Sequence, residues 1–352
     1  MIKSDNIDWN ILQTYIHDNL IIANKHPIYN LWILDYTPKV LSKRLWDEYT
    51  LACRGLVIDD KGNIIARTFE KFMSVDEIDL TEISNMLNYE IFEKIDGTLI
   101  ILFYYDVENV WLVASSASFI SEQSIVARNM FNEMNVFNKL NVQNTYLFEL
   151  IYPSNRIVVD YGDRNEIILI SVIHTKSNEE MLYDDMLNKY SNIFNIVKKF
   201  TYDITNILEL YDFEEENKQG FVIRYSNSYR VMIKFSEYLK LYEILTNLSD
   251  LMVWEYLVNN YDFNALLGRV SDDYYRILMN KVNVFNLKYN EIELGALREF
   301  IRIYHINGIV DRKKFAVESI KSKYKSILFK LYDKKSYNHV VWNMIKPNSE
   351  IV

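Results

Sequence analysis

Cysteine is almost absent from this chain, because Cys53 is the single one among 352 residues. A lone cysteine cannot form an internal disulfide, which excludes a disulfide-stapled secreted domain and predicts a reducing, cytoplasmic setting. The chain also lacks an apolar run of about 18 residues, so no membrane span is expected. Residues 1–6 contain no apolar segment of the secretory type. The five histidines are scattered, and none has the spacing of metal ligands.

Glycine and proline are scarce as well, with eight and four copies, a bias that by itself excludes no functional class. Hydrophobic residues make up 49% of the chain and charged residues 25%, which is an ordinary globular composition. At this length the chain can form two domains, each with its own core.

Charge is distributed unevenly along the chain. The formal net charge is −9, which argues against a nucleic-acid partner. Residues 311–352, however, carry ten Lys or Arg against four Asp or Glu, a local balance of +6 that leaves −15 for residues 1–310. This basic segment either binds phosphates or is a solvated helix face. Its expected basic face includes Lys321, Lys323, Lys325 and Lys330.

The candidate functional residues of the sequence are organised around the stretch from Glu93 to Thr98. It reads Glu-Lys-Ile-Asp-Gly-Thr and leads into the apolar run 99–105, which predicts a buried strand entered through a tight turn. Lys94 then lies at the mouth of a strand, near Gly97, where a ligand can approach the backbone closely. A lysine in such a pocket can lose its proton and act as a nucleophile. The alternative is a solvated lysine beside an ordinary turn.

Most of the first 245 residues are rich in predicted strands. Residues 1–50 mix helical and irregular signals, and a helix is expected over 121–135. From residue 235 onward the periodicity is helical, and the shift in composition near 245 predicts a domain boundary. Strands are predicted at 53–58, 64–67, 99–105, 110–115, 145–152, 155–161, 166–173, 219–225 and 229–234.

Several charged residues fall near the ends of these strands. Arg54 and Lys71 bracket the first hairpin, where they either bind one anion or are two surface charges. Glu149 lies inside an apolar run and needs a cation, a ribose hydroxyl or a lysine as a partner. Lys234 ends the last strand. Several cations around Lys94 would lower its pKa and hold a polyphosphate, an arrangement that fits nucleotidyl transfer.

Lys94-Ile95-Asp96-Gly97 resembles the nucleotidyl-lysine motif of the covalent nucleotidyltransferases, which comprise ATP-dependent DNA and RNA ligases and mRNA capping enzymes. The likeness to phage-type ATP-dependent RNA ligases extends from about residue 30 to residue 245, and residues 342–347 resemble cellular and viral relatives of that group. The segments that carry it are 46–48, 53–56, 69–72, 148–149, 153–158, 220–222 and 233–234.

The resemblance implies an α+β chain with two domains. Residues 1–245 would form a nucleotidyltransferase domain of ATP-grasp-like antiparallel sheets with flanking helices, and residues 246–352 an all-helical domain that helps to select RNA. It further implies a monomeric, cytoplasmic enzyme of cellular or viral origin that uses ATP and Mg²⁺ or Mn²⁺. Such an enzyme joins RNA 5′-phosphate and 3′-hydroxyl ends through lysyl-AMP and RNA-adenylate.

The family's functional residues carry over onto matching positions of this sequence. Lys94 would be the nucleophile, and Arg54 and Lys71 would contact the nucleotide and its phosphates. The resemblance further implies that Lys234 would contact the α-phosphate and that Glu149 would contact the ribose or the metal. Two further residues, Gly97 and Tyr36, are candidates for the same nucleotide pocket, Gly97 because it gives the nucleotide room.

Three positions depart from the family pattern, and each departure removes a charge. Gln219 stands where a glutamate is usual, Met232 where a second lysine is usual, and Ser116 where Lys or Arg is expected. Losing a charged contact to a transferring phosphoryl group commonly costs orders of magnitude in rate, and a carboxamide binds divalent cations less well than a carboxylate. These departures leave open an impaired or non-catalytic relative that binds nucleotide or RNA. Separately, an enzyme that ligates DNA or transfers GMP is a further alternative.

Overall fold

The computed structural model describes residues 6–79, 88–246, 249–259, 261 and 272–347, so most of the N-terminal segment considered for secretion lies outside it. The chain divides into two compact units, Met1–Leu239 and Lys240–Val352. The boundary expected near residue 245 falls within α7 (Ser236–Thr246), a helix that crosses this division.

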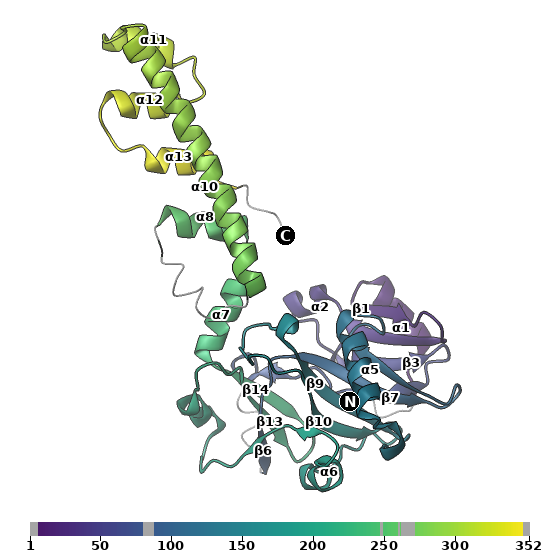
Figure 1. Cartoon of the computed structure of the whole chain (residues 1–352). Coiled ribbons are helices and arrows are strands. Elements are labelled where there is room, and N and C mark those ends of the chain that lie inside the picture. Colours follow the sequence, from purple (N-terminus) through teal and green to yellow (C-terminus); the bar gives the residue numbers. More distant parts are fainter. Residues whose placement is uncertain (1–5, 80–87, 247–248, 260, 262–271, 348–352) are drawn as a thin grey trace. The chain divides into compact units, whose positions relative to one another are not determined.

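Among the described residues, the first unit forms three sheets (Figure 1). The first sheet runs β1 (Ile21–Lys25), β2 (Leu31–Tyr36), β3 (Arg54–Asp59) and β4 (Ile64–Ala66), with antiparallel neighbours throughout. The hairpin of β3 and β4 was predicted from its turn residues. The strands β1 and β2 were not, because β1 buries a single side chain, Ile21, and so shows no clear alternation.

The second sheet has the order β11-β10-β9-β7-β8 and contains the strand that follows Lys94. Its members are β7 (Thr98–Tyr105), β8 (Val110–Ser115), β9 (Asn144–Ile151), β10 (Glu166–His174) and β11 (Asn195–Ile196). Side chains of β7 alternate between two cores: Ile100 and Leu102 pack in one, and Ile101 and Phe103 in the other. Burial on both faces explains why this strand is continuously apolar in sequence.

Helices cover part of the second sheet and complete its core. The predicted helix is confirmed as α5 (Glu122–Met134), which begins at the N-cap Ser121 and buries Ala127 and Phe131. Helix α6 (Tyr183–Tyr190) adds Met186 and Tyr190 to the same core. The remaining helices of this unit include α1 (Trp9–His17), α2 (Pro38–Lys43) and α3 (Glu48–Ala52).

The third sheet has the order β12-β6-β13-β14-β5. It consists of β5 (Met73–Ser74), β6 (Tyr89–Glu93), β12 (Lys199–Phe200), β13 (Gly220–Tyr225) and β14 (Arg230–Lys234). The predicted hairpin of β13 and β14 is confirmed, and β14 ends at Lys234 as expected.

One predicted strand is wrong. Residues 155–161 begin at the last residue of a short 3-10 turn, Pro153–Asn155, and do not join a sheet. The backbone amides of Val158 and Val159 instead donate to the carboxylate of Asp96, at 2.8 and 2.9 Å. A buried side-chain acceptor thus replaces the neighbouring strand that this apolar segment would otherwise need.

The second unit is helical where it is described, as the periodicity predicted. Its elements are α8 (Asp250–Val258), α10 (Asp272–Phe300), the π-helical turn η5 (Ile301–Ile306), α11 (Arg312–Ser319), α12 (Lys325–Tyr332) and α13 (Asn338–Met344). Figure 1 shows the long helix α10 with α8, α12 and α13 packed along it. Among the residues described, no helix combines the length and the apolarity that crossing a membrane requires.

Candidate active site

Lys94 lies in the loop between β6 and β7, at the mouth of a strand as the sequence predicted. Its backbone amide donates to the carbonyl oxygen of Gly220 at 2.9 Å, which ties the loop to the third sheet. Lys94 is half-buried and lines a cavity. Burial lowers the pKa of Lys94, and the charges of Lys234 and Arg54 lower it further, whereas Glu149 opposes the shift. An amine in this setting loses its proton more readily than an exposed lysine.

Glu149 reaches the same cavity from β9, whose backbone pairs Glu149 with Leu99 of β7. Burial raises the pKa of this carboxyl, while Lys94 and Arg54 lower it and the backbone amide of Gly97 donates a hydrogen bond to it. The partner that the sequence required for a carboxylate in an apolar strand is therefore the Lys94 amine together with Arg54.

Arg54 begins β3, directly after the short helix α3. Its guanidinium lies 5.5 Å from the ring centre of Phe72, and its Nη1 is buried without a hydrogen-bond partner among the described residues. A buried unpaired donor is costly, so a bound anion at this position would be stabilised. Tyr36 forms a hydrogen bond with Arg54, and burial raises the pKa of its phenol.

Two lysines complete the group of cations. Burial, together with Arg54 and Lys234, lowers the pKa of Lys71 to about 8, against the opposing charge of Glu77. The Nζ of Lys71 donates to the carbonyl of Phe72 at 2.8 Å. Lys234 is half-buried at the end of β14, and burial lowers its pKa as well. The structure thus brings together Lys94, Glu149, Arg54, Lys71, Lys234 and Tyr36, which come from all three sheets and their connections.

Close packing against β9 explains why residue 97 is a glycine, a reason that the sequence did not reveal. A Cβ at this position would lie 2.5 Å from the carbonyl oxygen of Leu150 and 3.0 Å from Cγ of Glu149. The glycine therefore allows β9 to approach the Lys94 loop, and its contact with a nucleotide stays a prediction.

The cavity at Lys94 has a volume of about 90 Å³. It adjoins a second cavity of about 450 Å³, since Phe69, Phe72 and Arg230 line both. The first cavity alone is small for a nucleotide, whereas the two together fall in the range of ligand sites. Apolar and aromatic side chains line the cavity at Lys94, among them Phe92, Ile170 and Val222.

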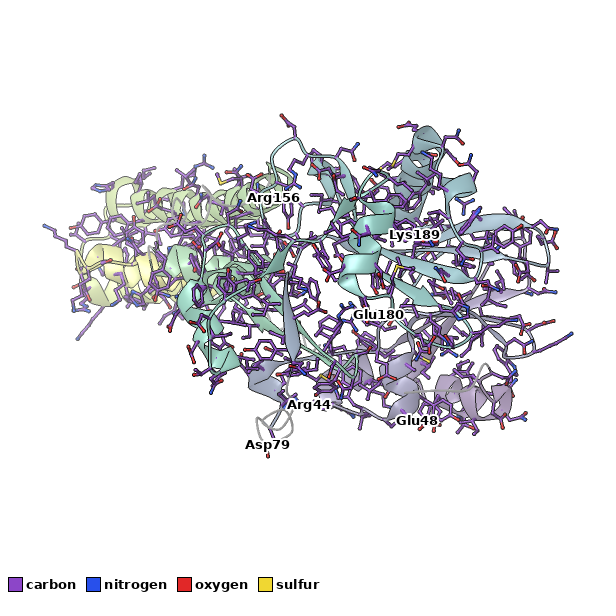
Figure 2. All side chains as sticks on the ribbon, turned by 90° about the horizontal axis from the view of Figure 1, so that it is seen from below. Arg44, Glu48, Asp79, Arg156, Glu180 and Lys189 are labelled. Atoms are coloured by element: carbon purple, nitrogen blue, oxygen red, sulfur yellow. The ribbon has the colours of Figure 1, made fainter. Side chains whose placement is uncertain are left out.

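A buried ion cluster beside these cavities was missed by sequence analysis. Glu180, labelled in Figure 2, accepts hydrogen bonds from Arg224 at 2.8 Å, from Ser171 at 2.6 Å and from Arg230. Burial alone would raise the pKa of Glu180, but Arg230 and Arg224 outweigh it and hold the pKa at about 2. The three charged residues come from separate strands and loops, so no local sequence pattern predicts the cluster.

Two of the three departures from the family pattern lie next to the site. Met232 is buried and pairs across the hairpin with Val222, which lines the cavity. Gln219 is also buried, and its Nε2 donates to the hydroxyl of Tyr238 at 2.8 Å. Ser116 lies against β3, since a Cβ at Gly55 would be 3.3 Å from its Cα.

A divalent metal ion fits the site only together with a phosphorylated ligand. The described part of the chain contains no group of three or more His, Cys, Asp or Glu side chains able to hold a metal. Glu149 offers one carboxylate beside Lys94, whereas the oxygens of Asp96 accept bonds from Val158, Val159 and Tyr238. One carboxylate combined with substrate phosphates is a common way for proteins to hold Mg²⁺.

The sequence of residues 52–239, more than half of the chain, matches the model of the RNA ligase family. The chain belongs to this family of RNA ligases. Its fold is similar to an archaeal ATP-dependent RNA ligase, with a TM-score of 0.50 at 12% identity over 79% of this chain and 76% of that one.

Another similar structure is the RNA ligase of Naegleria gruberi, determined as a lysine-to-methionine mutant with AMP and Mn. Its TM-score is 0.42 at 11% identity, over 50% of this RNA ligase family member and 57% of that chain. No curated protein sequence matches the chain.

Proposed function

We propose that this chain is an ATP-dependent RNA ligase that joins RNA 5′-phosphate and 3′-hydroxyl ends, with Lys94 as its nucleophile. The observation that carries the proposal is that Lys94 lines one cavity with Glu149 and Arg54, where desolvation and neighbouring cations lower the pKa of the amine. A neutral amine is the form that attacks phosphorus.

The reaction would proceed in three displacements. The Nζ of Lys94 forms a bond to the α-phosphorus of ATP, and the bond to the pyrophosphate oxygen breaks. The RNA 5′-phosphate then attacks the lysyl-AMP, which frees Lys94 and leaves an RNA-adenylate. Finally the RNA 3′-hydroxyl attacks the 5′-phosphate, and AMP leaves as the phosphodiester forms.

The residues around Lys94 supply binding and charge stabilisation in this scheme. The unpaired Nη1 of Arg54 and the ammonium of Lys71 would hold phosphate oxygens, and Lys234 would stabilise charge on the α-phosphate. Glu149 would accept a ribose hydroxyl or bind Mg²⁺ or Mn²⁺. When bound, the metal neutralises charge on the leaving pyrophosphate.

The first experiment is incubation of the purified protein with ATP radiolabelled at the α-phosphate and Mg²⁺, without RNA. We expect label to become covalently attached to the wild-type chain and not to a Lys94→Ala variant. Lys139→Ala is the matched control, because Lys139 is exposed and lies outside the site. Label that persists in Lys94→Ala would show that another residue is the nucleophile.

A non-catalytic nucleotide- or RNA-binding protein is the second candidate, favoured by the missing charges at Gln219, Met232 and Ser116. Folded wild-type protein that binds ATP or RNA but never becomes labelled would establish this candidate. Offering GTP and NAD as donors, and DNA in place of RNA, tests the remaining ligase and capping alternatives.

A further inference from the structure

Gln219, Tyr238 and Asp96 form a buried chain of hydrogen bonds that ends in the Lys94 loop. The hydroxyl of Tyr238 donates to Oδ1 of Asp96 at 2.7 Å, and Nε2 of Gln219 donates to the same hydroxyl at 2.8 Å. Both Gln219 and Asp96 are less than a tenth exposed. These hydrogen bonds therefore join the residue before β13, the start of α7 and the loop that carries Lys94.

The direction of each bond in this chain is fixed by the single proton of the Tyr238 hydroxyl. A carboxylate accepts hydrogen bonds and cannot donate them, so this proton goes to Asp96. The phenolic oxygen of Tyr238 can then only accept from its second neighbour. Residue 219 must therefore be a donor, and the amide of Gln219 meets this requirement.

A glutamate at position 219, as the family pattern has it, would not fit this network. Its carboxylate would place a lone pair against the lone pair of Tyr238 and a second negative charge close to Asp96. The other oxygen would gain no compensating bond, because Oε1 of Gln219 is buried and has no hydrogen-bond partner among the described residues. Leaving buried acceptors opposed in this way is destabilising.

Asp96 transmits the effect of this network to the reacting groups. Its other oxygen accepts from the amides of Val158 and Val159, and its own amide faces the hydroxyl of Tyr161 at 2.8 Å. Asp96 is thereby fixed from four sides, and the next residue, Gly97, donates to Glu149. Displacing Tyr238 would release one of these four contacts and loosen the loop between Lys94 and Glu149.

We infer that Gln219 is a positioning residue, which holds the Lys94 loop through Tyr238 and Asp96 and does not bind the metal ion. For the effect on ligation, this inference rests on the proposed function. It gives the loss of the family's glutamate a structural explanation: the position here requires a hydrogen-bond donor.

The test compares Gln219→Met, Gln219→Glu and Tyr238→Phe with the double variant Gln219→Met/Tyr238→Phe. We expect each single variant to lower the thermal midpoint of unfolding by roughly 2–4 °C. Each should also slow the formation of lysyl-AMP by a factor on the order of 10. In the Tyr238→Phe background, Gln219→Met should have little further effect, because the bond it removes is already lost. Gln143→Glu is the control for the charge change, since Gln143 is exposed.

A magnesium titration distinguishes positioning from metal binding. We expect Gln219→Glu to need at least as much Mg²⁺ as the wild type for half-maximal labelling of Lys94. A variant that labels faster, needs less Mg²⁺ and unfolds at the wild-type temperature would show that residue 219 is a metal position. Gln219→Met with wild-type stability and rate, or effects that simply add in the double variant, would equally overturn the inference. The unfolding measurements need no activity, so they test it even if the protein proves not to be a ligase.

Discussion

Lys94 and Glu149 line one cavity, and the charge of each opposes the pKa shift that partial burial causes in the other. Burial lowers the pKa of the lysine and raises that of the glutamate, while the attraction between the two acts in the opposite sense on both. The pair therefore tunes the protonation of the proposed nucleophile, and Arg54 acts on both members.

Replacing Glu149 by glutamine should move the pH dependence of labelling to lower pH. Glu149 raises the pKa of Lys94, so its removal lets that pKa fall further and the neutral amine appear earlier. The maximal rate should drop by about 10²-fold or more, because the proposed contact to ribose or metal is lost. Single-turnover labelling across neutral and alkaline pH measures both effects, with the exposed Glu133→Gln as control. An unchanged profile would mean that the two groups are not coupled.

Lys71 should limit the reaction on the alkaline side. Its pKa is lowered to about 8, so the ammonium proposed to bind phosphate loses its charge above that pH, whereas the proposed nucleophile Lys94 must lose its own proton to attack. We expect kcat/KM for lysyl-AMP formation to rise and then fall with pH. Lys71→Arg should extend the activity to higher pH, since arginine stays protonated. If the falling limb is the same in Lys71→Arg, another group causes it.

Glu180 should be important for stability through its two arginine partners. Its removal leaves Arg230 buried without a carboxylate partner and Arg224 with Glu90 alone, which we expect to cost about 3–5 kcal/mol in Glu180→Gln. The folded-state pKa of about 2 lies below the ordinary value of 4.5, so the contribution is complete above pH 4.5 and is lost as the pH falls toward 2. Urea unfolding of wild type and variant should therefore differ at neutral pH and converge in acid. Glu179→Gln, an exposed neighbouring change, should unfold like the wild type at both pH values.

The basic face predicted in the C-terminal unit remains a prediction about RNA. Lys321, Lys323 and Lys325 are exposed, Lys330 is half-buried, and Lys321 forms an exposed ion pair with Glu318 at 3.1 Å. Reversing the charge of Lys323 and Lys325 should weaken RNA binding and reduce its dependence on salt concentration. Fluorescence-anisotropy titrations at several salt concentrations measure both quantities. Equal affinity and equal salt slope for variant and wild type would identify these lysines as a solvated surface.

The local features of the site could be predicted from the sequence alone. The Asp-Gly turn before an apolar run placed Lys94 at a strand mouth, and hairpin patterns placed Arg54 and Lys234 at strand ends. These features depend on turn chemistry and on alternation within a few residues, which are written in the chain locally. Segment 155–161 is the exception, because Asp96 satisfies its amides where a strand partner was expected.

Which charged residues come into contact depends on the three-dimensional fold. Arg54, Glu149 and Lys234 come from three different sheets, and Tyr238 reaches Asp96 across 142 positions of sequence. Glu180 likewise meets Arg224 and Arg230 across 44 and 50 positions. A buried charge is stable only where a partner and hydrogen bonds compensate for lost water, and such partners leave no periodic pattern in a sequence. The fold determines the protonation of Lys94 because it supplies those partners.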